Sequence, residues 1–449
     1  MNESNHPTTI PAHAQLNGTP IPGFEDIHGW YALRRRQQDR LERPVEDLRE
    51  FFDGDSDQLV TISLFINITD FLMAQRALAA LLEGWTVERE CRYEYDEPAL
   101  VQRRAVEVAP KKFDFVIREG RQFWRGPDGE KLVIDLDTEE NTTHPSSQMT
   151  FSIPQSRYTW LRDLLPKIQE WADKHHFWRG QAITGRGEFI EFDQNTAWED
   201  VLIPEETRRT IERNCIELLK FSDLFKANEI PLKRGLLLHG KPGTGKTMIG
   251  RALAQKCGVT FILSTPGMLD DSRDVRRVFS WGRRFAPSIL FFEDFDMVAA
   301  ERHSSYSSNE VLGEFLAGLD GLDAGEGVIA IATTNDLNAI EPALKDRPNR
   351  FDVILEIPAM GSEERKKFLS KWKEKHGGDF DVENLVARSE HFTGAQIQEL
   401  CRLAVFEAVE ERIKAEKTEP ELLPLTQGHF NAAMQKLPNR PKKSIGFGG

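Results

Sequence analysis

The sequence predicts an α/β protein with three parts: a five-stranded parallel sheet with helices on both faces, a separate α+β domain before it, and a small helical lid after it. Two patterns lead to this fold class. In the middle of the chain, apolar runs of four to six residues alternate with amphipathic stretches, as in parallel strands that are buried on both faces and joined by helices. Strand-like and helix-like stretches are mixed before this region, and only helical periodicity follows it.

The first part of the chain is expected to divide after residue 54. Residues 1–54 begin with an aperiodic stretch rich in Pro, Asn, Thr and His, which predicts a disordered arm followed by a helical lead-in. Residues 55–186 are expected to form the α+β domain, and they contain no catalytic motif. Its strands are expected at residues 59–66, 87–95, 113–117 and 132–136, and one helix is expected to face the core with Trp160, Leu164, Leu165, Ile168 and Trp171.

The second part, residues 187–360, is expected to hold the parallel sheet, and residues 361–437 the lid. The five strands are expected at residues 235–239, 259–264, 288–292, 328–333 and 353–357. The lid is expected to consist of helices at residues 362–376, 381–388, 394–415 and 427–436, with no strand. Residues 438–449 are expected to be a tail.

A glycine-rich loop directly follows the first strand of the sheet and precedes a helical stretch. It reads Gly240-Lys241-Pro242-Gly243-Thr244-Gly245-Lys246-Thr247 and fits the phosphate-binding pattern G-x-x-x-x-G-K-[ST]. Glycines let backbone N–H groups turn inward around a phosphate, and the helix N-terminus adds a favourable dipole. We expect Lys246 to reach the β- and γ-phosphates of ATP and the Thr247 hydroxyl to bind Mg²⁺. The strand–loop–helix context predicts a P-loop NTPase, with nucleotide contacts from Gly240, Lys241, Pro242, Gly243, Thr244, Gly245, Lys246, Thr247 and Met248.

Two acids end the third apolar run. Residues 288–292 are followed by Glu293 and Asp294, where a P-loop enzyme needs carboxylates beside Mg²⁺. The acids stand in the order Glu-Asp, whereas Asp-Glu is usual. We therefore expect Glu293 on the metal side, as a ligand of Mg²⁺, and Asp294 as the acid that orients the attacking water. Because Asp is one methylene shorter than Glu, the water must lie closer or the strand must lean in.

Polar residues at two further strand ends complete the expected catalytic set. Asn335 ends the fourth strand, where a side chain at the carboxyl edge of the sheet can bind the γ-phosphate or the water. Arg347 and Arg350 lie in a Pro-Asn turn before the last strand, and two such arginines are costly to bury without anions. They form either a surface salt-bridge pair or arginine fingers that reach the γ-phosphate in a neighbouring subunit.

With these motifs in this order, the chain resembles the AAA ATPase family from about residue 191 to residue 434. The matching residues outside the loop and the acids are Trp198, Glu199, Asp200, Asn309, Leu312, Leu316, Leu319, Asp320, Gly321, Asn335, Arg347, Arg350, Thr393, Gly394 and Ala395. The resemblance implies that Asn335 is the sensor 1 residue and that the backbone of Gly394 and Ala395 closes over adenine. It also implies a homo-oligomer, typically a hexamer, that remodels proteins, with residues 55–186 selecting a protein client or adaptor.

The sequence departs from the family pattern at three places. Lys241 stands where the family usually has Pro. The Glu293-Asp294 order resembles that of the mitochondrial AAA translocase that moves the folded Rieske protein. The segment after the second strand, residues 264–272, is shorter than the family pattern and lacks the aromatic residue that usually grips an unfolded polypeptide, which leaves Met268 and Leu269 as its apolar candidates. This favours a client that is not threaded as an extended strand.

Composition excludes some classes of function and leaves others open. The formal net charge of −14 disfavours nucleic acid as a partner, and no stretch is long and apolar enough to span a membrane. Four widely spaced cysteines without a CxxC pair predict reduced thiols in a cytoplasmic protein. A remodelling ATPase, a translocase of folded proteins, and a nucleotide-switched oligomeric scaffold with weak hydrolysis remain open.

Overall fold

The computed structural model divides into two compact units, Met1–His176 and Phe177–Gly449, and each is described by itself. The residues it describes are 15–16, 19–20, 42–54, 58–94, 97–139, 146–192, 196–300, 306–325, 327–340, 350–416 and 422–437. Within these residues no helix is both long and apolar enough to cross a membrane.

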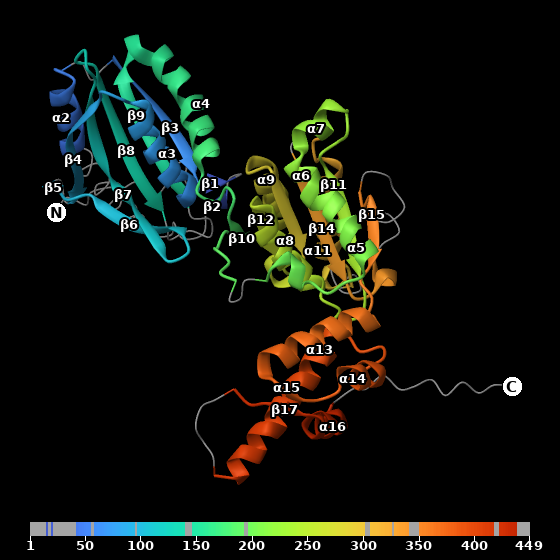
Figure 1. Cartoon of the computed structure of the whole chain (residues 1–449). Helices are drawn as coiled ribbons and strands as arrows, with labels where there is room; N and C mark the ends of the chain where they lie inside the picture. The colour runs from blue at the N-terminus through green and yellow to red at the C-terminus, as the bar shows by residue number, and fades with distance from the viewer. Residues whose placement is uncertain are drawn as a thin grey trace. The chain divides into compact units, whose positions relative to one another are not determined.

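The first unit is built on an antiparallel seven-stranded sheet in the order β3-β9-β8-β7-β4-β5, with β6 paired to β7 (Figure 1). Helices α3 and α4 pack together against the strands of this sheet. The elements are β1 (Gln15–Leu16), β2 (Thr19–Pro20), α2 (Glu42–Phe51), β3 (Leu59–Ile66), α3 (Ile68–Leu81), β4 (Thr86–Glu94), β5 (Glu97–Ala99), β6 (Gln102–Ala109), β7 (Lys112–Arg125), β8 (Lys131–Glu139), β9 (Ser146–Pro154), η3 (Gln155–Arg157) and α4 (Tyr158–His175).

The four strands expected in this unit are present as β3, β4 and parts of β7 and β8, but β5, β6 and β9 were missed. In β9 the buried side chains of Met149, Phe151 and Ile153 alternate with polar residues, which is the period-2 signal of a half-buried strand. The expected core face of α4 is partly wrong. Leu164 and Ile168 are buried as expected, whereas the three other expected residues are only half-buried because the buried face is completed by Leu161 and Ala172.

The second unit contains a parallel sheet of six strands in the order β10-β12-β13-β14-β11-β15, so the expected number of five is wrong. The additional strand, Ala182–Thr184, has only three residues and therefore gives no apolar run in the sequence. It lies before residue 187, where the sheet domain was expected to begin. The elements are β10 (Ala182–Thr184), η4 (Trp198–Asp200), α5 (Glu205–Ile211), η5 (Glu212–Glu217), α6 (Leu218–Lys220), α7 (Ser222–Ala227), β11 (Arg234–His239), α8 (Lys246–Cys257), β12 (Thr260–Ser264), η6 (Pro266–Met268), α9 (Ser272–Arg284), β13 (Ser288–Phe292), α10 (Phe295–Ala300), α11 (Tyr306–Asp320), β14 (Val328–Thr334), η8 (Leu337–Ala339) and β15 (Val353–Glu356).

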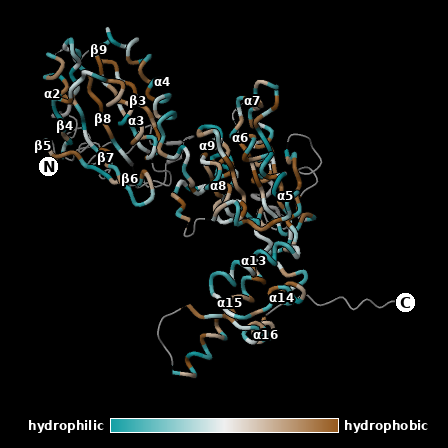
Figure 2. The backbone as a smooth tube through the Cα atoms, viewed as in Figure 1, coloured by the Kyte–Doolittle hydropathy of each residue, from teal (hydrophilic) through white to brown (hydrophobic). Residues whose placement is uncertain are grey.

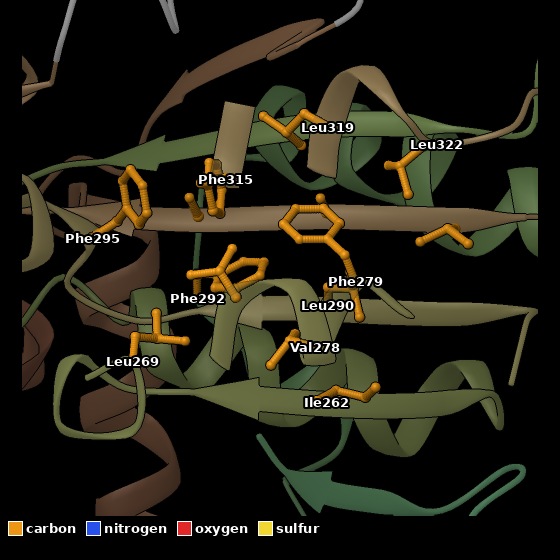
Figure 3. Packing of buried hydrophobic residues seen from close by; sticks show 14 of the residues in the cluster. Ile262, Leu269, Val278, Phe279, Leu290, Phe292, Phe295, Phe315, Leu319 and Leu322 are labelled. Carbon is orange, nitrogen blue, oxygen red and sulfur yellow. The ribbon is translucent and has the colours of Figure 1, made fainter. Parts of the chain in front are cut away.

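Both faces of this sheet are covered, as the continuous apolar runs predict. Along β11, Leu237 packs into one hydrophobic cluster, and its neighbours Leu236 and Leu238 pack into another. The first cluster joins the strands to α9 and α11, and its aromatic centre is Phe279, Phe292 and Phe315 (Figure 3). The second cluster joins them to α5 and α8. The apolar strands therefore form the inside of a three-layer unit (Figure 2).

The lid consists of the four helices that the sequence predicts: α13 (Ser362–His376), α14 (Val382–Arg388), α15 (Gly394–Lys414) and α16 (Gln427–Lys436). They enclose a separate core that includes Phe380, Leu385 and Phe430. The expectation that the lid lacks strands is wrong, since β16 (Gly378–Asp379) pairs in parallel with β17 (Leu425–Thr426). Two residues are too few to show a strand period.

Substitution of Phe315 tests how α11 packs against the sheet. Its ring is fully buried, with centroids 4.8 Å from Phe292 and 4.3 Å from Phe295. We expect Phe315→Ala to lower the free energy of unfolding by about 3–5 kcal/mol because it leaves a cavity. Hydrogen exchange of the β13 and β14 amides measures this loss. Phe406→Ala removes a ring that is 64% exposed on α15, and it should change stability by less than about 0.5 kcal/mol. Equal effects of the two substitutions would contradict the packing.

Candidate nucleotide-binding site

The candidate site lies where the carboxyl ends of three adjacent parallel strands meet. Strand β14 pairs with β11 on one side and with β13 on the other. The glycine-rich loop follows β11, the acidic pair follows β13, and Asn335 follows β14. The sheet therefore brings together three segments that lie far apart in the chain, at the edge where open α/β sheets bind ligands.

The loop adopts a conformation that depends on its glycines. Gly243 and Gly245 have φ values of +80° and +103°, and Gly245 is the residue before α8. A Cβ atom on Gly243 would lie 2.7 Å from the Cβ of Ala395 in the lid. The carbonyl of Gly243 accepts a hydrogen bond of 3.1 Å from the Ala395 N–H. The phosphate loop and the start of α15 are thus in direct contact.

Lys246 lies inside this loop and is only 6% exposed. Its Nζ donates to the carbonyl oxygens of Gly240 (2.7 Å) and Lys241 (3.2 Å) and to Oδ1 of Asn335 (2.9 Å). Burial lowers the pKa of the Lys246 ammonium, and the carboxylates of Asp294 and Asp296 oppose that shift. All three acceptors are neutral, so a phosphate beside this poorly hydrated charge would be strongly attracted.

The acid next to the loop is Asp294. Its Oδ1 accepts a hydrogen bond of 3.0 Å from Nδ2 of Asn335, so one amide connects Asp294 to Lys246. The Asp294 N–H donates to Oγ1 of Thr333 at 3.0 Å. The Glu293 side chain is half-buried, and its N–H donates to the carbonyl of Ser264 at 2.9 Å. Of the two acids, Asp294 alone lines the cavity described next.

A cavity of about 580 Å³ opens beside these groups. The sheet domain and the lid both contribute walls. The lining residues are Thr196, Asp200, Val201, Leu202, Ile203, Pro242, Gly243, Thr244, Gly245, Lys246, Thr247, Met248, Arg251, Asp294, Thr333, Asn335, Met360, Phe368, Gly394, Ala395 and Gln398. Its volume falls in the range of small-molecule sites.

Most of the residues expected to bind nucleotide line this cavity, from Pro242 to Met248 and at Gly394 and Ala395. Gly240 and Lys241 do not line it, and their carbonyls hold Lys246 instead. The apolar wall of the cavity was not expected from the sequence. Part of it was detectable, because the run of residues 201–203 directly follows the Trp198-Glu199-Asp200 motif. Met360, Phe368 and Gln398 carry no local signal.

Of the two arginines expected as fingers, the structure describes only Arg350. Arg350 is 6% exposed, and its Nε and Nη2 bind Oδ1 and Oδ2 of Asp320 at 3.1 and 2.9 Å. Its guanidinium is therefore engaged within its own chain by a bidentate pair. Arg347 lies among residues 341–349, outside the described part of the chain. The assignment of both as fingers stays a prediction.

The segment of residues 264–272 is a compact turn. Arg186 donates from Nη2 to the carbonyl of Gly267 (2.6 Å) and to Oδ2 of Asp270 (3.1 Å). Asp271 then begins α9 with a capping box. Leu269, one of the two expected apolar contacts for a client, is 6% exposed and belongs to the hydrophobic core, so its side chain is not available. Met268 is half-buried.

The donor set suits Mg²⁺ better than a metal that needs a protein cage. Among the described residues, no group of three or more His, Cys, Asp or Glu side chains could hold a metal. Mg²⁺ needs fewer protein ligands, because it takes phosphate oxygens and waters together with one or two side chains. The Thr247 hydroxyl and the Glu293 carboxylate would be such a set, and Thr247 lines the cavity beside Lys246.

Comparison with known proteins accounts for the loop, the acids and the lid together. Residues 236–359 match the model of the ATPase family associated with various cellular activities (AAA), and residues 379–423 match the AAA+ lid domain. The chain carries an AAA ATPase domain with its lid. The predicted resemblance is thereby confirmed for these parts, and the AAA domain spans β11 to the end of β15.

Curated relatives match part of this chain. A cell division cycle protein 48 homolog of Archaeoglobus fulgidus is 32% identical over 269 residues, which cover 56% of this chain and 37% of that protein. A proteasome-activating nucleotidase of Sulfurisphaera tokodaii is 37% identical over 211 residues, covering 44% of this chain and 54% of that protein. ATPase family gene 2 protein of Schizosaccharomyces pombe is 31% identical, over 56% of this chain and 31% of that protein. The chain thus spans about a third to a half of these relatives.

The contact between the phosphate loop and the lid can be tested at Gly243. We expect Gly243→Ala to weaken nucleotide binding at least tenfold, because the new methyl group meets Ala395 at 2.7 Å and strains a residue with φ of +80°. Titration with a fluorescent ADP analogue measures the affinity. Gly313→Ala on α11 is the matched control, since a Cβ there meets nothing within 4 Å. Unchanged affinity in Gly243→Ala would mean that the loop binds nucleotide in another conformation.

Proposed function

We propose that this protein hydrolyses ATP in an oligomeric ring and couples the reaction to remodelling or translocation of a protein client. One observation carries the proposal. A phosphate-binding loop, a buried lysine, a carboxylate and the start of the lid line a single cavity of about 580 Å³. Such a cavity can bind a triphosphate, hold a water against it, and sense its presence through the lid.

The proposed chemistry assigns one task to each side of the cavity. The backbone N–H groups of the loop, together with Lys246, bind the phosphates, and Thr247 with Glu293 forms the Mg²⁺ site. When bound, Mg²⁺ supplies positive charge that neutralises the phosphate oxygens. Asp294 accepts a hydrogen bond from the attacking water and orients it, and Asn335 keeps this carboxylate beside Lys246.

Coupling to motion is proposed to run through the lid. The lid contributes Met360, Phe368, Gly394 and Ala395 to the cavity wall, with the last two closing over adenine. The hydrogen bond from Ala395 to Gly243 joins the lid to the phosphate loop. A nucleotide that contacts both sides favours one lid orientation, and loss of its γ-phosphate removes part of that preference.

The ring is proposed from the arginines and from the relatives. Arg347 is the residue that we propose reaches the neighbour's γ-phosphate, and we propose six subunits. Arg350, paired with Asp320, would act there only after that pair opens. One relative is named a proteasome-activating nucleotidase and another a cell division cycle protein 48 homolog. Their similarity supports a protein client, which residues 55–186 would select, and gives no support to nucleic acid.

A translocase of folded proteins is the second candidate, and one observation favours it. Residues 264–272 are fixed by Arg186, and the segment offers a client only the half-buried Met268. The Glu293-Asp294 order is similar to that of the translocase of the folded Rieske protein.

A nucleotide-switched scaffold that does not turn over ATP is the alternative. A purified chain that assembles with ATP but does not release phosphate would favour that scaffold. We propose a cytoplasmic location, supported by four free cysteines among the described residues.

The role of Asp294 predicts a separation of binding from hydrolysis. We expect Asp294→Asn to bind ATP as tightly as the native chain, because the loop and Lys246 are unchanged, and to hydrolyse it about 100-fold more slowly. Phosphate release and nucleotide titration measure the two quantities. The exposed Asp323 provides the control, and Asp323→Asn should hydrolyse at the native rate. A native rate in Asp294→Asn would show that another group orients the water.

The role of Arg347 predicts complementation between subunits. Arg347→Ala should bind ATP normally and hydrolyse it at least tenfold more slowly, because it removes positive charge from the neighbour's site. Lys246→Ala should bind ATP poorly. When the two inactive variants are mixed, some interfaces combine an intact loop with an intact arginine, so phosphate release should partly recover. Mixtures that stay as inactive as either variant alone would argue against hydrolysis between subunits.

A further inference from the structure

The main chain at Asp294 has an uncommon conformation. Its φ is +44°, in the left-handed region that residues other than Gly seldom occupy, although Asp tolerates it better than most. The residue lies between β13 and α10, and the adjoining Glu293 N–H is fixed by the carbonyl of Ser264. The direction of the Asp294 carboxylate therefore depends on what holds this one peptide.

The group that holds it is the hydroxyl of Thr333. Strands β13 and β14 pair from Ser288 with Val328 to Phe292 with Ala332, and the ladder ends there. Just beyond it, the Asp294 N–H donates to Oγ1 of Thr333 at 3.0 Å. Thr333 is 1% exposed and also lines the cavity. A side-chain oxygen thus replaces the carbonyl that a continuing ladder would offer.

Residue spacing places a second contact beside the first. Thr333 and Asn335 are two residues apart at the end of β14, where alternate side chains point the same way. Thr333 binds the main chain of Asp294, and Asn335 binds its carboxylate at 3.0 Å. An Asp side chain has one rotatable bond fewer than Glu. Its reach is therefore set by the position of its own peptide more than by rotation of its side chain.

We propose that Thr333 is a positioning residue for hydrolysis, which fixes the Asp294 peptide so that the short carboxylate stays at the cavity wall. The inference rests on the proposed function of Asp294. The proposal connects the Glu-Asp order with a structural requirement. Because Asp is shorter than Glu, its main chain must be fixed, and the Thr333 hydroxyl on β14 fixes it. Thr333 itself does not need to touch the reacting atoms.

The experiment compares Thr333→Val, which keeps the shape and loses the hydroxyl, with Thr333→Ser, which keeps the hydroxyl. We expect Thr333→Val to lower kcat about tenfold while KM and the affinity for ADP stay within about twofold. Thr333→Ser should keep kcat within about twofold. Thr260→Val is the control, because Thr260 is equally buried at 1% and donates to the Phe285 carbonyl at 2.9 Å. It should lose stability but keep kcat.

A double substitution tests whether Thr333 acts through Asp294. In an Asp294→Asn background the positioned carboxylate is already gone, so adding Thr333→Val should lower kcat by less than about twofold more. A further tenfold loss would overturn the proposal, as would a native kcat in Thr333→Val or equal losses in the Val and Ser variants.

If Thr333→Val does not fold, Thr333→Ala takes its place. A native chain that does not hydrolyse ATP overturns the proposed function and this inference with it, whereas native hydrolysis with an active Thr333→Val overturns the inference alone.

Discussion

The parallel register of β11, β14 and β13 is the constraint on which the site depends. It sets the carboxyl ends of three strands side by side, so that the loop after Gly240, the acids after Phe292 and the amide of Asn335 meet at one edge. Strands in this register must be buried on both faces, because the crossover helices pack there. The apolar clusters on the two faces and the polar site at the edge therefore have a common cause.

Electrostatics at that edge are arranged around one buried cation. Lys246 donates to two loop carbonyls and to Asn335, while Asp294 and Asp296 act on it from a greater distance. Burial lowers the pKa of its ammonium, which means that the charged form is poorly solvated in this position. An incoming phosphate can replace the neutral acceptors with charged ones, which gives charge-assisted hydrogen bonds. Asn335 contacts both this lysine and the carboxylate of Asp294, as the proposed role of Asp294 requires.

What the sequence could predict depends on how local the signal is. The phosphate loop and the acids are contiguous patterns, and Asn335 ends an apolar run, so each could be placed from neighbouring residues alone. The three-residue strand β10 and the two-residue strands of the lid are too short to show a period. Thr333 was missed for another reason. Its significance comes from the Asp294 peptide just beyond the end of β13, and neither segment by itself shows that the two lie side by side. The partner of Arg350 was likewise hidden, since Asp320 lies on a different element.

The acidic pair also connects the site to the short segment after β12. Glu293 donates its N–H to the carbonyl of Ser264, the last residue of that strand, so the two sides of this contact cannot move far apart without breaking it. The segment that follows is fixed at its far end by the capping box of Asp271 and in between by Arg186. A loop held at three points transmits a displacement as a rigid body, whereas a long flexible loop would absorb it. In the proposed function, a change around the acids would therefore move a compact surface with little apolar side chain exposed, as the second candidate, a translocase of folded proteins, requires.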